Sequence, residues 1–175
     1  GSNRINRYTI AKATKGFAEY IKESGADACK KGVAIAYDNR RQSRFLSEVT
    51  AGVLANEGIK VYLFEDLRTT PELSFAVRHL GCFGGVVITA SHNPPEYNGY
   101  KIYDDTGCQL IPEVADKVIS HIAKIEDEFS VKCISLQDAG ELIEIIGDEV
   151  DEPYYKEVLK LQFDEGAKRN VKVVY

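Results

Sequence analysis

The chain has 175 residues, enough for one domain with a hydrophobic core, and its composition is that of an ordinary globular protein. Its formal net charge of −5 disfavours a nucleic-acid or anionic-membrane surface, because such surfaces need clustered positive charge. No apolar run approaches the roughly 20 residues of a membrane helix and no signal peptide is visible, so we expect a cytoplasmic protein without nucleic-acid or membrane partners.

Strand-like runs and amphipathic stretches alternate along the first half of the chain. Apolar side chains recur every three or four positions in the stretches expected to be helical, whereas the expected strands are short, continuous apolar runs. Pro71 suits the first turn of a helix, because it lacks the N–H that would go unpaired there. In chain order we predict a helix over 5–24, a strand over 32–38, a helix over 45–58, a strand over 59–64, a helix over 71–80 and a strand over 84–89.

The Asn98-Gly99 pair interrupts this alternation, because Asn-Gly accommodates the positive φ values of a tight reversal. We therefore expect residues 100–103 to run antiparallel to the third strand, with Tyr100 and Tyr103 packing on one face. The rest of the chain is predicted to contain a helix through 114–125, an apolar run of undecided structure over 142–146 and a helix over 151–163. The pattern predicts a three-layer α/β domain with a mixed, mostly parallel sheet and helices on both faces.

The last residues suggest a second domain. A polar stretch over 164–170 precedes a strand-like run over 171–175. A strand with no partner segment after it is typical of the start of a further domain. We therefore predict one domain over residues 1–165 and, over 166–175, a linker and the first strand of a truncated second domain.

The 4 cysteines and 3 histidines lack the spacing of a metal site, since no C-x-x-C pair is present. We expect the cysteines to be reduced and to act as small apolar fillers. A zinc site built from protein side chains alone is not expected.

Ser91 lies just past the end of the third predicted strand, within the run ITASHNPPEYNGYKIY over 88–103. In parallel α/β sheets, ligands bind beyond the carboxyl ends of the strands. The loop that follows the first predicted strand carries Arg40, so the two loops are expected to face one crevice. Arginines and a helix N-terminus favour an anion such as phosphate there, and the chain returns through Asn98-Gly99 to Lys101.

Several other roles for Ser91 can be weighed from the residues. The nucleophile-elbow pattern G-x-S-x-G is absent, and His92 is a poor base for its neighbour because adjacent extended residues point to opposite sides. The glycines match neither common nucleotide-binding fingerprint. A cap or turn role, a non-catalytic phosphate-binding module and a flavodoxin-like nucleotide-binding domain remain as alternatives.

The run TASHNP over 89–94, continued by YNGYK over 97–101, resembles the active-site loop of the α-D-phosphohexomutases, the phosphoglucomutase and phosphomannomutase family. Other segments resemble the first domain of that family passing into its second: Asp38-Asn39-Arg40 with Ser43, Thr70-Pro71 and 171–175. The runs NRINRYTIAKATKGFAEY and TPELSFAVRHLG are most similar to the phosphoglucomutase and phosphopentomutase branch.

The resemblance implies an intramolecular phosphotransferase, an isomerase of sugar phosphates. Ser91 would carry a phosphoryl group between the C1 and C6 hydroxyls of a hexose, or C1 and C5 of a pentose, through a bound bisphosphate. Lys101 would transfer protons with the sugar hydroxyl, Arg40 would steady the phosphoryl oxygens or the proton relay, and His92 would orient phosphate or substrate. Phosphoglucomutase is the favoured activity, with phosphomannomutase and phosphopentomutase as alternatives.

The resemblance also implies cofactors and partners. One Mg²⁺ would be held by the phosphate oxygen of Ser91 and by an Asp-rich loop of the second domain, and glucose 1,6-bisphosphate would serve as activator and intermediate. Asp104-Asp105 is only a pair and is interpreted as a turn. The expected partners are a phosphosugar and further domains of the same chain, so residues 1–175 alone are expected to be inactive.

Overall fold

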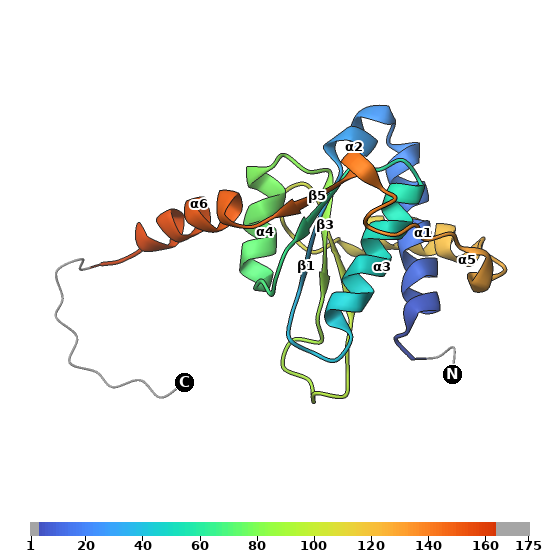
Figure 1. Ribbon diagram of the computed structural model, residues 1–175, viewed down its shortest axis with the longest axis horizontal. Helices are drawn as coiled ribbons and strands as arrows, with labels where there is room; N and C mark the ends of the chain where they lie inside the picture. Colours follow the sequence, from blue (N-terminus) through green and yellow to red (C-terminus); the bar gives the residue numbers. More distant parts are fainter. Residues whose placement is uncertain (1–3, 164–175) are drawn as a thin grey trace.

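A five-stranded sheet lies at the centre of the computed structural model, which describes residues 4–163 (Figure 1). The strand order is β4-β3-β1-β2-β5, in which β1 pairs parallel with β2 and β3, β2 pairs parallel with β5, and β4 runs antiparallel to β3. The strands are β1 (Val33–Tyr37), β2 (Val61–Phe64), β3 (Gly84–Ile88), β4 (Tyr100–Tyr103) and β5 (Ile143–Ile146). The predicted mixed, mostly parallel sheet is confirmed, whereas the strand predicted over 171–175 lies outside the described residues.

The predicted helices form close to their expected bounds, and one short helix appears that the sequence pattern did not reveal. The helices are α1 (Arg7–Glu23), α2 (Ala26–Lys31), α3 (Ser43–Asn56), α4 (Thr70–His79), α5 (Pro112–Ala123) and α6 (Asp148–Leu159), with short 3₁₀ helices at Glu128–Ser130 and Gly140–Leu142. The unpredicted helix is α2, which is too short to display a helical period. In the described part of the chain, no helix is long and apolar enough to cross a membrane.

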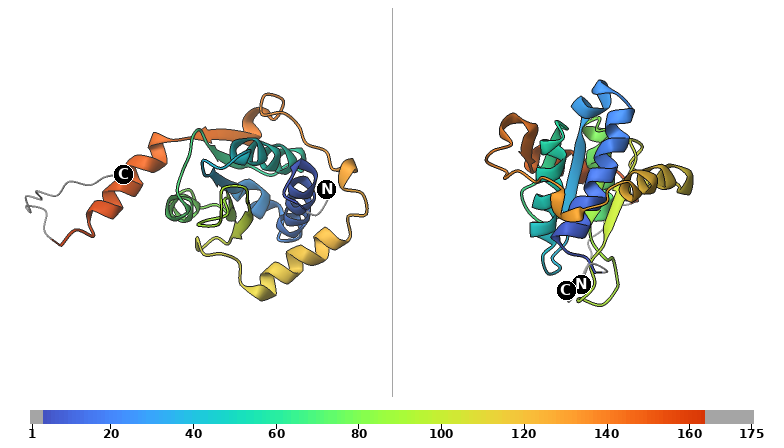
Figure 2. Two further views of the ribbon diagram at one scale, coloured as in Figure 1. Left: turned by 90° about the horizontal axis from the view of Figure 1, so that it is seen from below. Right: turned by 90° about the vertical axis from the view of Figure 1, so that its right-hand side faces the viewer.

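Alternating residues of the central strands divide the core between two faces of the sheet. On β1, Val33, Ile35 and Tyr37 pack against α1 and α3, whereas Ala34 and Ala36 pack with residues of α4. All five residues of β1 and of β3 are buried, as expected for parallel strands that are covered on both sides. Helix α5 packs beside α1, and its Val118 belongs to the core on the α1 face of the sheet (Figure 2). The three-layer α/β prediction is therefore confirmed.

The two tyrosines of β4 lie on opposite faces of the sheet, so the prediction of one shared face was wrong. Tyr100 packs with the core beneath α1, whereas Tyr103 belongs to the core beneath α4. Successive strand residues alternate between faces, and two residues three positions apart therefore diverge. The Tyr100 hydroxyl accepts a hydrogen bond from Thr14 Oγ1 at 3.0 Å, and its burial raises the pKa of this phenol.

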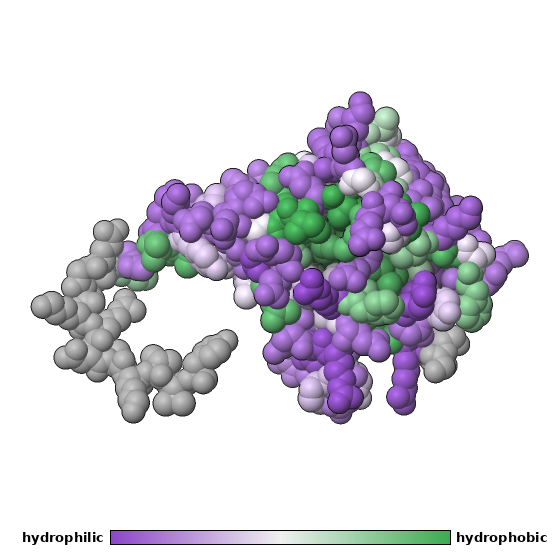
Figure 3. Space-filling model, in the orientation of Figure 1, coloured by the Kyte–Doolittle hydropathy of each residue, from purple (hydrophilic) through white to green (hydrophobic). Residues whose placement is uncertain are grey.

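The apolar run of undecided structure becomes β5, the edge strand beside β2. Its residues are less covered than those of the central strands, because in the described sheet β5 pairs with β2 alone. Ile145 is 52% exposed, and Figure 3 shows an apolar area over this edge of the sheet.

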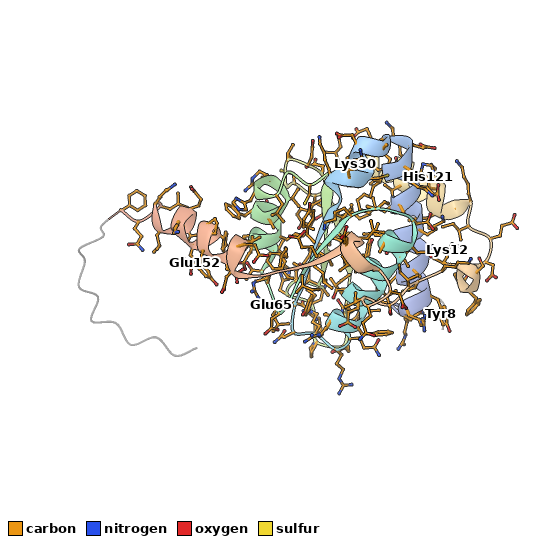
Figure 4. All side chains as sticks on the ribbon, turned by 45° about the horizontal axis from the view of Figure 1, so that its top comes forward. Tyr8, Lys12, Lys30, Glu65, His121 and Glu152 are labelled. Carbon is orange, nitrogen blue, oxygen red and sulfur yellow. The ribbon has the colours of Figure 1, made fainter. Side chains whose placement is uncertain are left out.

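Helix α6 projects away from the body of the domain (Figures 1 and 2), and only its first turn joins the core. Val150 is fully buried, and Asp151 accepts two hydrogen bonds from the Arg68 guanidinium at 2.8 and 2.5 Å. Glu152, on the same helix, is exposed (Figure 4). The Arg68–Asp151 pair therefore anchors the start of this helix, the half-buried Tyr154 of the next turn packs against Phe75 of α4 with ring centroids 5.5 Å apart, and the residues after it are exposed.

The four cysteines are all free thiols, and they differ in burial. Cys82 is 2% exposed, and burial raises its pKa to about 12, which fits the predicted role of an apolar filler. Cys108 is exposed, so the same prediction was wrong at that position.

Gly52 provides a test of the packing between α3 and the chain before β5. A Cβ at this position would meet the carbonyl oxygen of Ile134 and would lie 2.8 Å from Cys133 Sγ. Gly52→Ala is therefore expected to lower the free energy of unfolding by roughly 1–3 kcal/mol, because overpacking displaces backbone. Gly→Ala inside an unobstructed helix instead stabilises by about 1 kcal/mol, so the sign of the change tests the contact.

Urea unfolding of the wild type and of Gly52→Ala measures the difference in their free energies of unfolding. Glu48→Ala, on the exposed side of the same helix, is the control and is expected to change the free energy by less than about 0.5 kcal/mol. An unchanged or increased stability of Gly52→Ala would contradict the packing described here.

Candidate functional site

Two loops at the carboxyl edge of the sheet line one cavity. Strands β1 and β3 are neighbours and run parallel, so the loops that follow them leave the sheet side by side. The cavity has a volume of about 820 Å³, and its lining residues come from both loops and from the start of α4. They are Asp38, Asn39, Arg40, Arg41, Thr70, Thr89, Ser91, Asn93, Pro95 and Glu96. The single crevice expected from the sequence is therefore present.

Ser91 is exposed in this cavity on a strained backbone. Its φ of 56° lies in the left-handed region, which non-glycine residues seldom adopt and which costs of order 1–3 kcal/mol. The Ser91 N–H donates to Thr89 Oγ1 at 2.9 Å, and Thr89 is itself buried. The conformation therefore depends on contacts that fix the loop around the serine.

Lys101 reaches Ser91 from the neighbouring strand. Pairing of Val87 with Lys101 and of Ile88 with Tyr100 places the lysine beside the end of β3. Lys101 Nζ donates a hydrogen bond to Ser91 Oγ at 2.6 Å. An ammonium group at this distance stabilises negative charge that develops on the serine oxygen.

The connection between β3 and β4 is not the tight Asn-Gly reversal that the sequence predicted. The left-handed residue of this loop is Ser91, and neither Asn98 nor Gly99 has a positive φ. Glycine is required at position 99 for another reason, because a Cβ there would lie 2.5 Å from the carbonyl oxygen of Thr89. The chain just before β4 therefore passes close to the end of β3. The connection between the two strands is a longer loop, which places Ser91 in the cavity.

The Arg40 guanidinium holds this loop through backbone carbonyl groups. Its Nη1 donates to the carbonyl oxygens of Pro94 at 2.7 Å and Tyr97 at 3.0 Å. Its Nη2 donates to the carbonyl oxygens of Ser91 at 2.8 Å and Asn93 at 2.6 Å. Its Nε donates to a carboxylate oxygen of Asp38 at 3.1 Å, with which it forms an ion pair. These bonds account for all five N–H groups of a guanidinium.

This geometry gives Arg40 a different environment from the one expected. The resemblance implies that the guanidinium steadies the phosphoryl oxygens or the proton relay, whereas its donors here face the loop backbone. The side chain is 10% exposed, so solvent screens these charge-assisted bonds only weakly. In this arrangement Arg40 positions Ser91 by holding the residues on both sides of it.

His92 is the candidate that the structure does not bring into the cluster. Its side chain is exposed, and the residues that line the cavity do not include it. Arg41 lines the cavity, whereas Arg44 forms a surface pair with Glu48 at 3.4 Å. The structure thus joins Ser91, Lys101 and Arg40, and adds Arg41 to the cavity wall.

Thr89 has a positioning contact that the sequence analysis missed. A hydroxyl two residues before Ser91 is a signal for a local side-chain to backbone bond, and that pattern was available in the sequence. Asp104-Asp105 forms the predicted turn, in which Asp104 Oδ1 accepts hydrogen bonds from the N–H groups of Thr106 at 3.0 Å and Cys108 at 3.2 Å. In the described part of the chain, no group of three or more histidine, cysteine or acidic side chains is arranged to bind a metal ion.

Comparison with known proteins identifies the family. Residues 1–129 match the family described as phosphoglucomutase/phosphomannomutase, alpha/beta/alpha domain I. The chain belongs to this phosphoglucomutase/phosphomannomutase family. The family resemblance stated from the sequence is therefore confirmed.

Relatives within the phosphoglucomutase/phosphomannomutase family act on more than one sugar, according to their names. A phosphoglucomutase of Staphylococcus epidermidis is 41% identical over 162 residues, which cover 92% of this chain and 29% of the relative. A probable phosphoribomutase of Schizosaccharomyces pombe is 46% identical over 112 residues, covering 64% of this chain and 19% of the relative. The chain therefore spans less than a third of the length of these relatives.

Solved structures of the family share the fold. A Thermus thermophilus protein described as a phosphomannomutase superposes with a TM-score of 0.75 at 28% identity, covering 91% of this chain and 33% of that one. The phosphoglucomutase parafusin of Paramecium superposes with a TM-score of 0.62 at 21% identity, covering 86% of this chain and 32% of that one, and supports the fold alone.

Arg40→Lys tests whether this guanidinium holds the Ser91 loop. Lysine keeps the charge but cannot donate to four carbonyl groups at once, and bonds to charged groups are worth about 1.5–3 kcal/mol each. Amide hydrogen exchange at Asn93 and Tyr97, whose N–H groups bond within the loop, is expected to accelerate about ten- to hundredfold. Arg44→Lys, at a 69% exposed side chain, is the matched control and is expected to leave these rates unchanged. Equal exchange in both variants would contradict the role given to Arg40.

Proposed function

We propose that residues 1–165 form the phosphoserine domain of a phosphosugar mutase and that residues 166–175 begin its next domain. The whole protein would move phosphate between the C1 and C6 hydroxyls of glucose phosphate. One observation supports this function most directly, the 2.6 Å hydrogen bond from Lys101 Nζ to the exposed Ser91 Oγ. The name of the S. epidermidis relative favours glucose as the sugar.

In the proposed reaction, Ser91 enters as a phosphoryl donor. The sugar hydroxyl oxygen bonds to phosphorus while the bond between phosphorus and Ser91 Oγ breaks, giving a bound bisphosphate. The Lys101 ammonium donates its proton to the departing Oγ and regains one from the sugar hydroxyl, so the proton balance closes on the lysine. After the bisphosphate turns over, the same steps in reverse return the other phosphate to Ser91.

This chemistry relies on positioning and charge neutralisation, because phosphoryl transfer has a loose transition state with charge spread over the oxygens. Lys101 provides one cation at the bond that breaks, and Arg41 provides another on the cavity wall. Arg40 acts on the loop backbone, and His92 would help to orient the phosphate or the sugar. Glucose 1,6-bisphosphate would serve as the activator and as the intermediate.

The described residues fit only part of a magnesium site. Mg²⁺ prefers oxygen ligands and phosphate, which a phosphorylated Ser91 would supply. Two carboxylates lie on the cavity wall, Asp38 and Glu96. Both oxygens of Asp38 already accept hydrogen bonds from Arg40, so this side chain is not a free ligand, and Glu96 alone does not make a metal site. We therefore assign one ligand to the Ser91 phosphate and the others to a loop of the following domain. The ion would neutralise charge on the transferring group.

A pentose phosphate is the second candidate substrate, moved between its C1 and C5 hydroxyls. The phosphoribomutase name of the S. pombe relative, at 46% identity, favours it. The choice of sugar can be measured by comparing kcat/KM for glucose 1-phosphate, ribose 1-phosphate and mannose 1-phosphate with the full-length protein.

Ser91→Ala in the full-length protein is expected to lower mutase activity by more than about 10³-fold, because it removes the oxygen that Lys101 contacts and that would carry the phosphoryl group. Intact-mass analysis is expected to show one phosphoryl group on the wild type after incubation with glucose 1,6-bisphosphate and none on the variant. Ser135→Ala, an exposed hydroxyl hydrogen-bonded to Asp138, is the control and should retain both properties.

Undiminished activity of Ser91→Ala would overturn the proposed function, as would stoichiometric copurification of a nucleotide or flavin. A protein that takes up phosphate on Ser91 but converts no sugar phosphate would instead be a non-catalytic phosphate-binding module. Residues 1–175 alone are expected to show no mutase activity, because most substrate and metal contacts would lie in further domains.

A further inference from the structure

Asn98, at the far end of the Ser91 loop, is bound by the first residue of α3 and by the turn that precedes this helix. Its Nδ2 donates to Ser43 Oγ at 2.8 Å and to the Arg41 carbonyl oxygen at 3.3 Å. Its Oδ1 accepts from the Gly99 N–H at 2.8 Å. All polar groups of the amide therefore have partners, and they link segments more than fifty residues apart in the sequence.

The next member of this network is Ser43, which is fully buried. Its hydroxyl donates to Asp38 Oδ1 at 2.8 Å, and the same oxygen accepts from the Arg40 N–H at 3.0 Å. The other carboxylate oxygen accepts from Arg40 Nε at 3.1 Å. A continuous series of hydrogen bonds thus runs from Asn98 through Ser43 and Asp38 to Arg40.

Arg40 and Asn98, the two ends of this series of hydrogen bonds, lie at opposite ends of the Ser91 loop. Arg40 binds the carbonyl groups of Ser91 and Asn93 near its start, and Asn98 lies immediately before Gly99, where the chain turns into β4. The turn that presents Ser43 is strained, because Gln42 has a left-handed φ of 65°. Strain in a non-glycine residue persists only where the surroundings fix it, and here the fixed turn presents the acceptors for Asn98.

We propose that Ser43 and Asn98 are positioning residues for phosphoryl transfer, which set the place of Lys101 relative to Ser91. This inference rests on the proposed function. Asn98 fixes the chain where it enters β4, and Lys101 is the second residue of that strand. A shift there changes the approach of Lys101 Nζ to Ser91 Oγ, and a misplacement of about 1 Å can cost about a hundredfold in rate.

Asn98 donates the hydrogen bonds to Ser43 and to the Arg41 carbonyl, so a substitution that removes only the donor tests their role. Asn98→Asp has the same shape and still accepts from the Gly99 N–H, but its carboxylate cannot donate to Ser43 or to the Arg41 carbonyl. Ser43→Ala removes the other half of the same link. Ser47→Ala is the matched control, because Ser47 is equally buried in α3 but, among the described residues, its hydroxyl bonds only to the Arg44 carbonyl at 2.7 Å in the same helix.

The test is the single-turnover rate constant for transfer of labelled phosphate from Ser91 to glucose 1-phosphate in the full-length protein. A variant that merely folds less well changes the amplitude of this reaction and leaves its rate constant unchanged. Ser43→Ala and Asn98→Asp are each expected to lower the rate constant about 10- to 100-fold, whereas Ser47→Ala stays within about twofold of the wild type. The double variant is expected to be little worse than either single one, because both remove one link.

Each outcome bears on the inference. If Ser43→Ala and Asn98→Asp have the same rate constant as Ser47→Ala, the inference is overturned. The proposed function would still stand, provided that the wild type transfers phosphate. A rate constant that falls equally in all three variants would also overturn it, because the effect would then come from the α3 core. If the wild type transfers no phosphate, the proposed function fails first, and the inference falls with it.

Discussion

The candidate site depends on one guanidinium group that binds backbone rather than ligand. The loop between β3 and β4 has little regular structure of its own, and Arg40 binds four of its carbonyl oxygens at 2.6 to 3.0 Å. Asp38 compensates the buried charge and fixes the side chain that does the binding. The left-handed serine, the reach of Lys101 and the shape of the cavity all require a loop held in this way.

The sheet and its layers could be predicted because they follow from short-range patterns. The continuous apolar runs of β1 and β3 indicate strands buried on both faces, and the rule that ligands bind at carboxyl ends places Ser91 and Arg40 at one crevice. The elements that escaped prediction are short or lie at an edge. Helix α2 is too short to show the periodicity of a helix. The run that forms β5 is short and apolar, and periodicity alone cannot distinguish such a strand from a segment of a buried helix.

The conformation of the site could not be predicted, because it depends on contacts between segments far apart in the sequence. Asn98-Gly99 has the local signature of a tight turn, but the Asn98 side chain is bound to Ser43 and its backbone does not adopt the positive φ of such a turn. The sequence likewise shows an arginine near a serine without showing what the guanidinium faces. Arg40 can be expected at the crevice from topology, but the carbonyl groups that surround it become visible only in three dimensions.

The left-handed backbone at position 91 limits which amino acid can occupy it. Threonine offers the same hydroxyl chemistry, but branching at Cβ makes a φ near 56° a severe steric problem. The backbone conformation at this position therefore favours serine over threonine, independently of the reactivity of the hydroxyl group. A threonine at this position would have to rotate the peptide group and thereby turn the carbonyl oxygen of residue 91 away from Arg40. Backbone geometry thus favours the primary alcohol of serine over the secondary alcohol of threonine.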